Sequence, residues 1–476
     1  MPAKNIWQRF TKSQRDTGKN KMPEIIADNI SVINSDALEG ATRLDAEYYQ
    51  PIYLRTVKLI GNMKTLRMYL EEIIHPTEIK RIYSEKGIQI LLAQNIENNR
   101  LNFNINVFME ISKKDALKRN RLKYSDVCMT RSGANFGDAA SYLGVPTNIY
   151  ACADCLILRP REIEGSYIAT FLNTKYGKYL LERGAYGMAQ PHIAPNYLYD
   201  IKLPYFSLKF ETEIKNIIEK SHEFFEKSRI SYSNAETLLL KVLDIKEIDL
   251  SHEPCYEVSS AETISASRID AEYYQPKYER VVAAIKKHPH KSVGEMFRLI
   301  KGVEPGSSAY CEEGMPFIRV SNLNKFEINS DNQQYLSAKI YAELKANYRP
   351  FKGEILLSKD ATPGIVYHLK ESIDGIISSG ILRLQALTDI KKEYICLVIN
   401  SLVGQSQIER DSGGSVIKHW KPSQVQKTLI PILPDKIQEK IELLCLESHS
   451  VRRQAKGLLE EAKKKVEDMI EKGQDD

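Results

Sequence analysis

The chain has 476 residues, of which 42% are hydrophobic and 27% are charged. This length allows two to four domains with ample buried core, and the composition is globular rather than disordered. The net charge of +5 permits a polyanionic partner, although a slight lysine excess on an ordinary soluble protein gives the same value. No run approaches the ~18 apolar residues of a membrane span, and residues 1–21 lack the apolar core of a secretory signal, so we expect a cytoplasmic protein.

The seven cysteines form no regular pattern. Cys152 and Cys155 make the only Cys-x-x-Cys pair, and a zinc site needs a second pair at matching spacing. We therefore expect buried, reduced thiols, and neither a metal nor another cofactor in this chain.

The chain begins with a predicted loose basic arm and is then organised around a repeat. Residues 1–35 form the arm, because Lys, Arg, Gln and Asn are frequent among them. Residues 43–51 then read Arg-Leu-Asp-Ala-Glu-Tyr-Tyr-Gln-Pro, and residues 268–276 read Arg-Ile-Asp-Ala-Glu-Tyr-Tyr-Gln-Pro. The last seven residues of each copy are identical, at an offset of 225, the difference between 270 and 45. Such a repeat indicates tandem domains, since the repeats of solenoids are much shorter.

The duplication continues at an offset of 227, the difference between 314 and 87. The matched pairs include Gly87 and Gly314, Asn95 and Asn322, Tyr167 and Tyr394, Asn173 and Asn400, Gly177 and Gly404, and Pro204 and Pro431. Each half of the chain is therefore predicted to be one structural unit with small insertions and deletions.

The first copy of the motif predicts a helix with Pro51 near its start and Tyr48 and Tyr49 on one face. Identity between the copies suggests that both meet the same kind of surface. Packing within each copy and docking of a partner explain that identity equally well. The candidate docking residues are Tyr48, Tyr49, Tyr273 and Tyr274.

The pattern predicts two mixed α+β domains, each followed by a long helix. The first domain spans residues 36–206, with strands starting at residues 88, 126 and 155 and a helix over 167–183. Residues 207–245 predict the first long helix, residues 246–267 a polar linker, residues 268–433 the second domain, and residues 434–476 the second long helix.

Both long helices carry a heptad seam with several small residues. Ile214, Ile217, Ser221 and Phe224 match Ile441, Leu444, Ser448 and Val451 at the same offset of 227, the difference between 441 and 214. We expect the helices to pair as an antiparallel coiled coil with pseudo-twofold symmetry. The alternative is that each helix covers only its own domain.

This plan of domain, long helix, domain and long helix resembles the specificity subunit of type I restriction-modification systems. The paired motifs, the domain ends at Pro204 and Pro431 and the two heptad helices carry the resemblance, which covers nearly the whole chain after residue 30. It implies two target recognition domains that each read half of a split DNA target. It also implies helices that set the spacing and dock methyltransferase subunits, which carry S-adenosylmethionine. A restriction and translocation subunit can join such a complex.

The residues agree with a DNA reader rather than a catalyst. The chain has no Asn/Asp-Pro-Pro-aromatic motif of an adenine methylase, no Walker A loop, no Gly-x-Gly-x-x-Gly and no His-Glu-x-x-His. A protein–protein scaffold is the main alternative function. A dispersed nuclease site of two acids and a lysine is a third, because one sequence does not reveal such a site.

Three loops in each half supply side chains suited to base and phosphate contacts. In the first half the candidates are Gln94, Asn95, Arg100, Arg131, Ser132, Asn135, Tyr186, Gln190 and His192. In the second half they are Ser321, Asn322, Lys359, Asp360, Thr362, Lys418, His419, Trp420 and Lys421.

Each loop also has a structural explanation. Asn95 and Asn322 recur at matched positions, which favours a role in a turn. The two matched histidines favour capping or packing, and Arg131 and Lys359 leave phosphate contact and structural roles equally open. Tyr186 and the cluster at 418–421 differ between the halves, as expected for two domains that read different sequences, but drift on a solvated loop gives the same difference.

Overall fold

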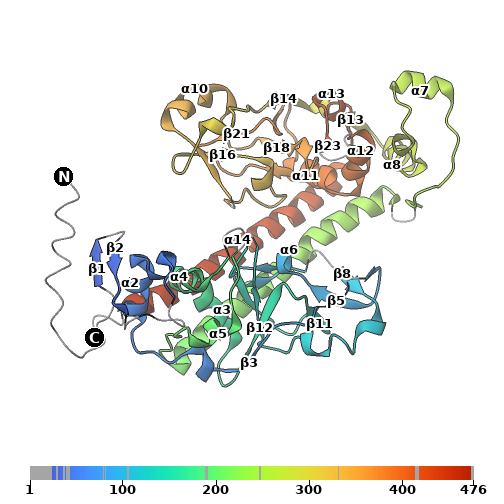
Figure 1. Ribbon diagram of the computed structural model, residues 1–476. Helices are drawn as coiled ribbons and strands as arrows, with labels where there is room; N and C mark the ends of the chain where they lie inside the picture. Colours follow the sequence, from blue (N-terminus) through green and yellow to red (C-terminus); the bar gives the residue numbers. More distant parts are fainter. Residues whose placement is uncertain are drawn as a thin grey trace. The chain divides into compact units, whose positions relative to one another are not determined.

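The computed structural model describes residues 24–27, 30–35, 38, 43–78, 80, 82–103, 107–133, 135–187, 191–245, 248–330, 332–412 and 418–472. The chain forms two compact units. Unit 1 comprises Met1–Phe224 and Gln454–Asp476, and unit 2 comprises Phe225–Arg453. Each unit contains one mixed domain and half of each long helix (Figure 1).

Unit 1 is built on two four-stranded sheets. The first has the order β10-β9-β12-β3 and is antiparallel, from β10 (Ala139–Ser141), β9 (Val127–Thr130), β12 (Cys155–Pro160) and β3 (Leu70–Ile74). The second has the order β11-β5-β8-β4, from β11 (Ile149–Ala151), β5 (Ile88–Leu91), β8 (Val107–Met109) and β4 (Tyr83–Ser84), with β11 parallel to β5. The short pair β6 (Ile96–Glu97) and β7 (Arg100–Leu101) lies beside them. The three strands predicted from residues 88, 126 and 155 are confirmed.

Unit 2 repeats both strand orders. Its first sheet runs β14-β22-β18-β20, from β14 (Phe297–Lys301), β22 (Ile381–Ala386), β18 (Ile355–Ser358) and β20 (Val366–His368). Its second runs β15-β17-β16-β21, from β15 (Tyr310–Cys311), β17 (Gln334–Leu336), β16 (Met315–Ile318) and β21 (Ile376–Ile377), with β16 parallel to β21. Short ladders join β13 (His290–Ser292) to β24 (Leu429–Pro431) and β19 (Asp360–Ala361) to β23 (Lys418–His419).

Matched residues make the same contacts in the two units. The Tyr167 hydroxyl donates to the Pro204 carbonyl at 2.6 Å, and the Tyr394 hydroxyl donates to the Pro431 carbonyl at 2.7 Å. The side-chain amides of Asn173 and Asn400 each bond to both backbone groups of one strand residue, Ala139 in unit 1 and Val366 in unit 2. The sequence repeat is therefore also a repeat of hydrogen bonds.

The helices of the two domains also correspond. Unit 1 contains α2 (Pro51–Ile60), α3 (Gly165–Asn173), α4 (Lys175–Gly184) and α5 (Pro195–Asp200). Unit 2 contains α7 (Ser260–Ala266), α8 (Pro276–Lys286), α9 (Val293–Met296), α10 (Ala338–Tyr348), α11 (Lys392–Asn400), α12 (Leu402–Asp411) and α13 (Pro422–Val425).

The single helix predicted over residues 167–183 is wrong, because α3 ends before Thr174 and α4 begins after it. The Thr174 hydroxyl accepts a hydrogen bond from the Gly177 amide at 3.0 Å and caps α4. A side chain at Gly177 would lie 2.1 Å from the Phe171 carbonyl oxygen, and one at Gly404 would lie 2.3 Å from the Ile399 carbonyl oxygen. The sharp bend between the two helices therefore requires glycine in both units.

Two structured segments fall inside regions that the sequence predicts to be loose. The strands β1 (Glu24–Ala27) and β2 (Ile30–Val32) form a hairpin within the predicted arm, beside α2 (Figure 1). The helix α7 lies within the predicted linker. A capping box at Ser259 and Glu262 accounts for its start.

The long helices are α6 (Leu208–Val242) and α14 (Asp435–Lys472), close to the predicted bounds. In unit 1 the Ser221 hydroxyl bonds to the Ala455 carbonyl at 2.8 Å, and Lys465 pairs with Glu213 at 2.8 Å. In unit 2 the Ser228 and Ser448 hydroxyls lie 3.0 Å apart. Within unit 1, residue numbers rise along one helix as they fall along the other, so the packed segments run antiparallel there.

The buried face of α6 differs slightly from the predicted seam. Ser221 and Ser228 are fully buried as predicted, but Ile218 and Phe225 are buried in place of Ile217 and Phe224. The face turns by one residue because α6 also covers the domain cores, as Leu239 does in the main core of unit 2.

No helix of the described segments is long and apolar enough to cross a membrane. The same segments hold no group of three or more His, Cys, Asp or Glu residues placed to bind a metal ion. Cys152 and Cys155 are buried and form no disulfide, with their sulfur atoms 3.7 Å apart.

Candidate nucleic-acid interface

The second and third predicted loops of unit 2 lie side by side. The ladder between β19 and β23 pairs Asp360 with His419 and Ala361 with Lys418. His419 Nδ1 lies 2.8 Å from Asp360 Oδ1, and the backbone amide of Trp420 donates to the Lys359 carbonyl at 2.8 Å. Residues about 60 positions apart therefore form one cluster, which we call loop cluster 2.

The matching loops of unit 1 meet in the same way and form loop cluster 1. Ser132 and His192 form an isolated β-bridge, as do Tyr186 and His192. Backbone hydrogen bonds of 3.0 and 2.8 Å join Tyr186 and His192. Arg131 Nη1 lies 2.8 Å from Nε2 of His75, which follows β3. The offset between Ser132 and Asp360 is 228, the difference between their numbers, so the two clusters occupy equivalent places.

In loop cluster 2 the carboxylate of Asp360 contacts both Lys359 and His419. Burial alone would raise the pKa of Asp360, but hydrogen bonds from Lys359 and His419 outweigh it and hold that pKa below its usual range. Lys359 is itself only 8% exposed and pairs with Asp360. Lys418, His419 and Lys421 are exposed, so these side chains can meet a phosphate or a base edge without rearrangement.

Several buried donors at or beside the clusters have no hydrogen-bond partner among the described residues. They are Arg131 Nε and His192 Nδ1 in unit 1, and Arg319 Nε and Trp420 Nε1 in unit 2. An unsatisfied buried polar group costs about 1–3 kcal/mol. Buried polar groups of this kind are commonly paired by water or by a ligand.

The first loop of each half is partly structural. Asn95 is 2% exposed and Asn322 is fully buried, so neither side chain is presented to a ligand. Asn95 accepts from the Leu92 amide at 2.8 Å and donates to the Asn102 carbonyl at 2.8 Å, and Asn322 accepts from the Arg319 amide at 3.1 Å. We therefore remove both asparagines from the proposed contact set. Their sequence neighbours Gln94 and Ser321 are exposed.

The remaining candidates divide by exposure. Asn135, Tyr186 and Thr362 are exposed, whereas Ser132 is half-buried. Arg100 is half-buried and pairs with Glu97 at 3.1 Å. Gln190 lies outside the described residues.

Trp420 was expected among the base-contacting residues, but it is only 1% exposed. Its indole lies in the main core of unit 2 with Ile408 and Val425. The apolar surface of the indole ring explains this burial, so Trp420 anchors the loop that carries Lys418 and Lys421 instead of facing a ligand.

The docking role expected of the paired tyrosines also changes. Tyr48 and Tyr49 are 4% and 5% exposed, in a small core with Ile25 and Ile33. Their rings therefore support the first motif from inside. Both are on the 3-10 turn at Ala46–Tyr49, which ends before α2 begins at Pro51.

The second motif presents its tyrosines differently. Tyr273 and Tyr274 are half-buried, on the 3-10 turn at Ala271–Tyr274. A docking role for these two remains a prediction.

Sequence reasoning missed two basic residues at the ends of equivalent strands. His75 follows β3 and contacts Arg131, and Lys301 ends β14, the strand that takes the place of β3 in unit 2. Both side chains are exposed. They precede the second and third predicted loops by more than 50 residues, so only the sheet order relates them to those loops.

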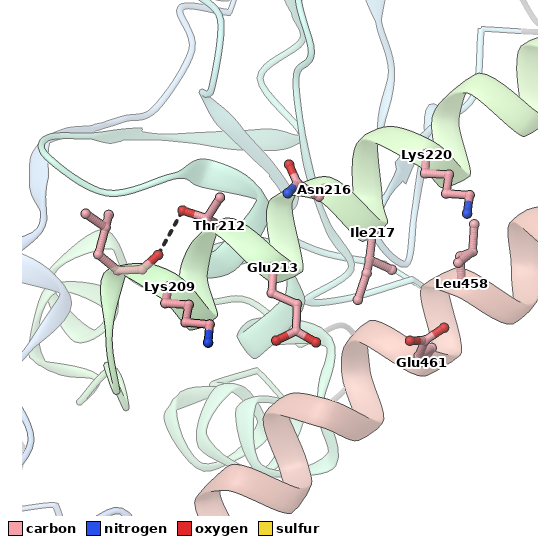
Figure 2. A pocket seen from close by; sticks show the side chains of 9 residues that line it. Lys209, Thr212, Glu213, Asn216, Ile217, Lys220, Leu458 and Glu461 are labelled. Atoms are coloured by element: carbon pink, nitrogen blue, oxygen red, sulfur yellow. Dashed lines mark hydrogen bonds between the residues drawn. The ribbon is translucent and has the colours of Figure 1, made fainter.

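An open groove along α6 and α14 in unit 1 offers a contrasting surface (Figure 2). Lys209, Glu213 and Lys220 project from α6, and Leu458 and Glu461 project from α14. Acidic and basic groups alternate along this lining, and Glu213 is already paired with Lys465. This lining gathers no catalytic set and has no excess of positive charge for a phosphate backbone.

Comparison with known proteins identifies one related domain in unit 2. Residues 288–442 match the family model described as the type I restriction modification DNA specificity domain. The matched span lies within unit 2 and contains β14, β18, β22 and loop cluster 2. Residues 288–442 are therefore similar to the DNA specificity domain of type I restriction-modification systems.

Solved structures add only a distant likeness. The chain is similar to the type I restriction-modification S subunit from M. genitalium, with 13% identity, a TM-score of 0.37, and coverage of 88% of this chain and 98% of that one. It is also similar to the HsdS subunit from Thermoanaerobacter tengcongensis, with 14% identity, a TM-score of 0.28, and coverage of 86% and 95%. The similarity on which the proposal below rests is the specificity-domain match over residues 288–442. No curated protein matches this chain.

Proposed function

We propose that the chain is the DNA-reading subunit of a type I-like restriction-modification or methylation-associated defence complex. In this proposal each loop cluster reads one half of a bipartite double-stranded DNA target. The observation that carries it is the recurrence of one loop cluster at equivalent places, through Ser132 and His192 in unit 1 and through Asp360 and His419 in unit 2.

The side chains of the two clusters support separate half-targets. Lys418 and Lys421 of unit 2 have no basic counterparts in the described part of unit 1, where Tyr186 is the exposed aromatic residue. Different base sequences require different donors and acceptors in the major groove. Two loops with a common scaffold and different tips can meet that requirement.

The long helices support a role in spacing and assembly. We propose that α6 and α14 pair as an antiparallel coiled coil with pseudo-twofold symmetry and set the distance between the half-targets. The buried serines Ser221, Ser228 and Ser448 allow the helix backbones to approach closely. Methyltransferase subunits would dock on this framework and supply S-adenosylmethionine, and a restriction subunit can join them.

The chain itself performs no chemistry in this proposal. A protein–protein scaffold is the competing function, and salt separates the two. Phosphate contacts make log affinity fall linearly with log salt, with a slope of about −0.9 per contact. A scaffold has no DNA affinity to lose.

The test is binding of the chain, with its modification subunit, to duplexes that carry or lack the methylated motif of the host. We expect tight, salt-dependent binding to the motif and weaker binding to scrambled DNA. Equal affinity for both duplexes, or no binding at low salt, would overturn the proposal. A double variant with Lys418→Ala and Lys421→Ala should weaken binding to both duplexes, and Lys440→Ala on α14 serves as the matched control.

A further inference from the structure

The two most exposed large hydrophobic side chains of the described residues occupy the same position of the repeat. Leu44 is 83% exposed and Ile269 is 92% exposed. They are the second residues of the two motif copies, 225 positions apart, the difference between their numbers. Single exposed apolar residues are ordinary on protein surfaces. Here, however, two strongly exposed apolar side chains occupy the same position of the repeat. This coincidence requires a common explanation.

Both side chains project from a braced backbone. Arg43 Nε bonds to Asp45 Oδ1 at 2.8 Å, and Arg268 Nε bonds to Asp270 Oδ1 at 2.8 Å. The two guanidinium groups also lie over the rings of Tyr48 and Tyr273, at 4.5 and 4.4 Å from the ring centroids. The same contacts therefore fix the residues on either side of Leu44 and of Ile269. Binding through a side chain held in this way loses little conformational entropy.

The bracing arginines also reach the end of a domain helix in each unit. Arg43 Nη2 donates to the Ala185 carbonyl at 3.4 Å, and Arg268 Nη1 donates to the Asp411 carbonyl at 3.1 Å. Ala185 follows α4 and Asp411 ends α12, which are equivalent helices. The position of each apolar side chain is thus fixed relative to its own domain.

Packing inside the chain accounts for the matched arginine, aspartate and first tyrosine of the two copies, but not for the exposed apolar residue between the arginine and the aspartate. Tyr48 and Tyr49 are buried beneath the β1–β2 hairpin, whereas Tyr273 and Tyr274 are half-exposed. At Ala271 the backbone carbonyl accepts a hydrogen bond from Tyr256, a residue that takes the place of Ser31 in the first copy. The surroundings of the two copies differ, yet both keep an exposed apolar residue at the same position, so we expect the requirement for that residue to lie outside the chain.

We infer that Leu44 and Ile269 anchor two copies of one protein partner, each through an apolar pocket of that partner. This inference rests on the proposed function, because the partner is the modification subunit. Leu and Ile are similar in size and hydrophobicity, and neither side chain has a polar group. A pocket that accepts both side chains is therefore apolar. The duplicated anchor also specifies that the same partner surface is used twice.

The surroundings predict unequal strength at the two sites. Beside Leu44 an open groove of about 950 Å³ is lined by Ile30, Ile33, Leu38, Tyr49 and Ile52, with Glu47, Gln50 and Arg55 also in its lining. Ile30 is 55% exposed and Ile52 is 40% exposed, so the apolar surface extends beyond the anchor. At the equivalent positions of the second copy the chain has Cys255 and Lys277.

Lys277 pairs with acidic side chains, so the surface around Ile269 is more polar than the surface around Leu44. Its ammonium lies 3.4 Å from Glu272 and 3.9 Å from Glu409. Burial of apolar area drives most protein association, so the site at Leu44 should fill first and the site at Ile269 second.

The experiment measures how many modification subunits bind the full-length chain, by native mass spectrometry and by titration calorimetry. The variants are Leu44→Glu, Ile269→Glu and the double variant. The wild type should bind two copies, each single variant one, and the double variant none. Losing a buried anchor corresponds to at least about 30-fold weaker binding at its site. The copy retained by Ile269→Glu should bind more tightly than the copy retained by Leu44→Glu.

Ile264→Glu is the matched control, because Ile264 is 77% exposed and its equivalent in the first copy, residue 39, is already Glu. This control should still bind two copies. Two copies on the double variant would overturn the inference and leave the proposed function intact. Failure of the wild type to bind any modification subunit would instead overturn the proposed function, and the inference with it. Melting temperatures of all variants should match that of the wild type, since the substituted side chains are exposed.

Discussion

His419 Nδ1 lies 2.8 Å from Asp360 Oδ1, which joins two loops of unit 2 that are far apart in the sequence. The same carboxylate also pairs with Lys359, so one acid orients two side chains at the edge of the proposed DNA surface. Preorganised side chains of this kind discriminate bases better than mobile ones, because less ordering is required on binding.

Replacing that acid should alter one half-target only. In Asp360→Ala, the Lys359 and His419 side chains lose their common partner, and discrimination at the second half-target should fall by about 1–3 kcal/mol per misread base pair. Methylation of degenerate targets by the assembled complex measures this effect. The first half of the motif should remain as strict as in the wild type. Asp374→Asn, on an exposed aspartate that pairs with Arg349 outside the cluster, is the control and should change neither half.

Lys418 and Lys421 should act on affinity rather than on sequence choice. Each lysine-to-alanine change should lower the magnitude of the salt slope by about 0.9 if the side chain contacts a phosphate. The measurement is DNA affinity at a series of salt concentrations, on target and scrambled duplexes. An unchanged slope in the double variant would place both lysines away from the DNA backbone.

The buried ion pairs of the two first sheets predict opposite dependence of stability on pH. Burial alone would raise the pKa of Glu354, but hydrogen bonds from Arg383 and Gln385 and from the Phe351 amide leave that pKa below its usual range. Its contribution to stability is therefore present above the pKa of an unfolded glutamate, about 4.3, and is lost as pH falls through the lowered value.

For Asp126, burial outweighs the hydrogen bonds from Arg159 and leaves the pKa of that carboxyl above its usual range. Its contribution is therefore present below the unfolded value and is lost as pH rises through the raised one. Thermal unfolding of Glu354→Gln and Asp126→Asn between pH 3 and pH 7 tests this contrast. The destabilisation by Glu354→Gln should grow as pH rises, and that by Asp126→Asn should shrink. The same trend in both variants would contradict the assignment.

The small residues packed between α6 and α14 predict that a larger side chain at these positions destabilises the protein. Ser448 is fully buried and its hydroxyl lies 3.0 Å from that of Ser228, so Ser448→Leu forces extra volume between α6 and α14. Overpacking of this kind costs about 1–3 kcal/mol and should lower the unfolding temperature. Ser450→Leu, two residues along on the exposed face, controls for helix propensity and should have little effect.

Much of the architecture follows from periodic patterns in the chain. The heptad spacing predicted α6 and α14, and the apolar runs predicted β5, β9 and β12, because these elements bury regular faces. The break at Thr174 was missed, since an apolar stripe continues across it and only the close approach at Gly177 reveals the bend. The β1–β2 hairpin was missed because a basic composition hid two short strands.

For the candidate site, the sequence predicted which residues lie in loops but not which of them are buried. Loop membership follows from turn residues, but the pairing of the second and third loops was not predicted, because it depends on the tertiary fold. Burial within a loop depends on tertiary packing, which the sequence does not display. Asn322 and Trp420 therefore belong to the interior, and His75 and Lys301 join the clusters only through the order of strands in the sheet.

The central claim is that this chain determines which DNA sequence is modified. The most direct test is methylome sequencing of the host with the chain intact, deleted, and carrying a foreign recognition domain in place of residues 64–206. We predict that deletion abolishes methylation of one split motif and that the domain replacement changes only one half of it. An unchanged methylome after deletion would contradict the claim and favour a scaffold.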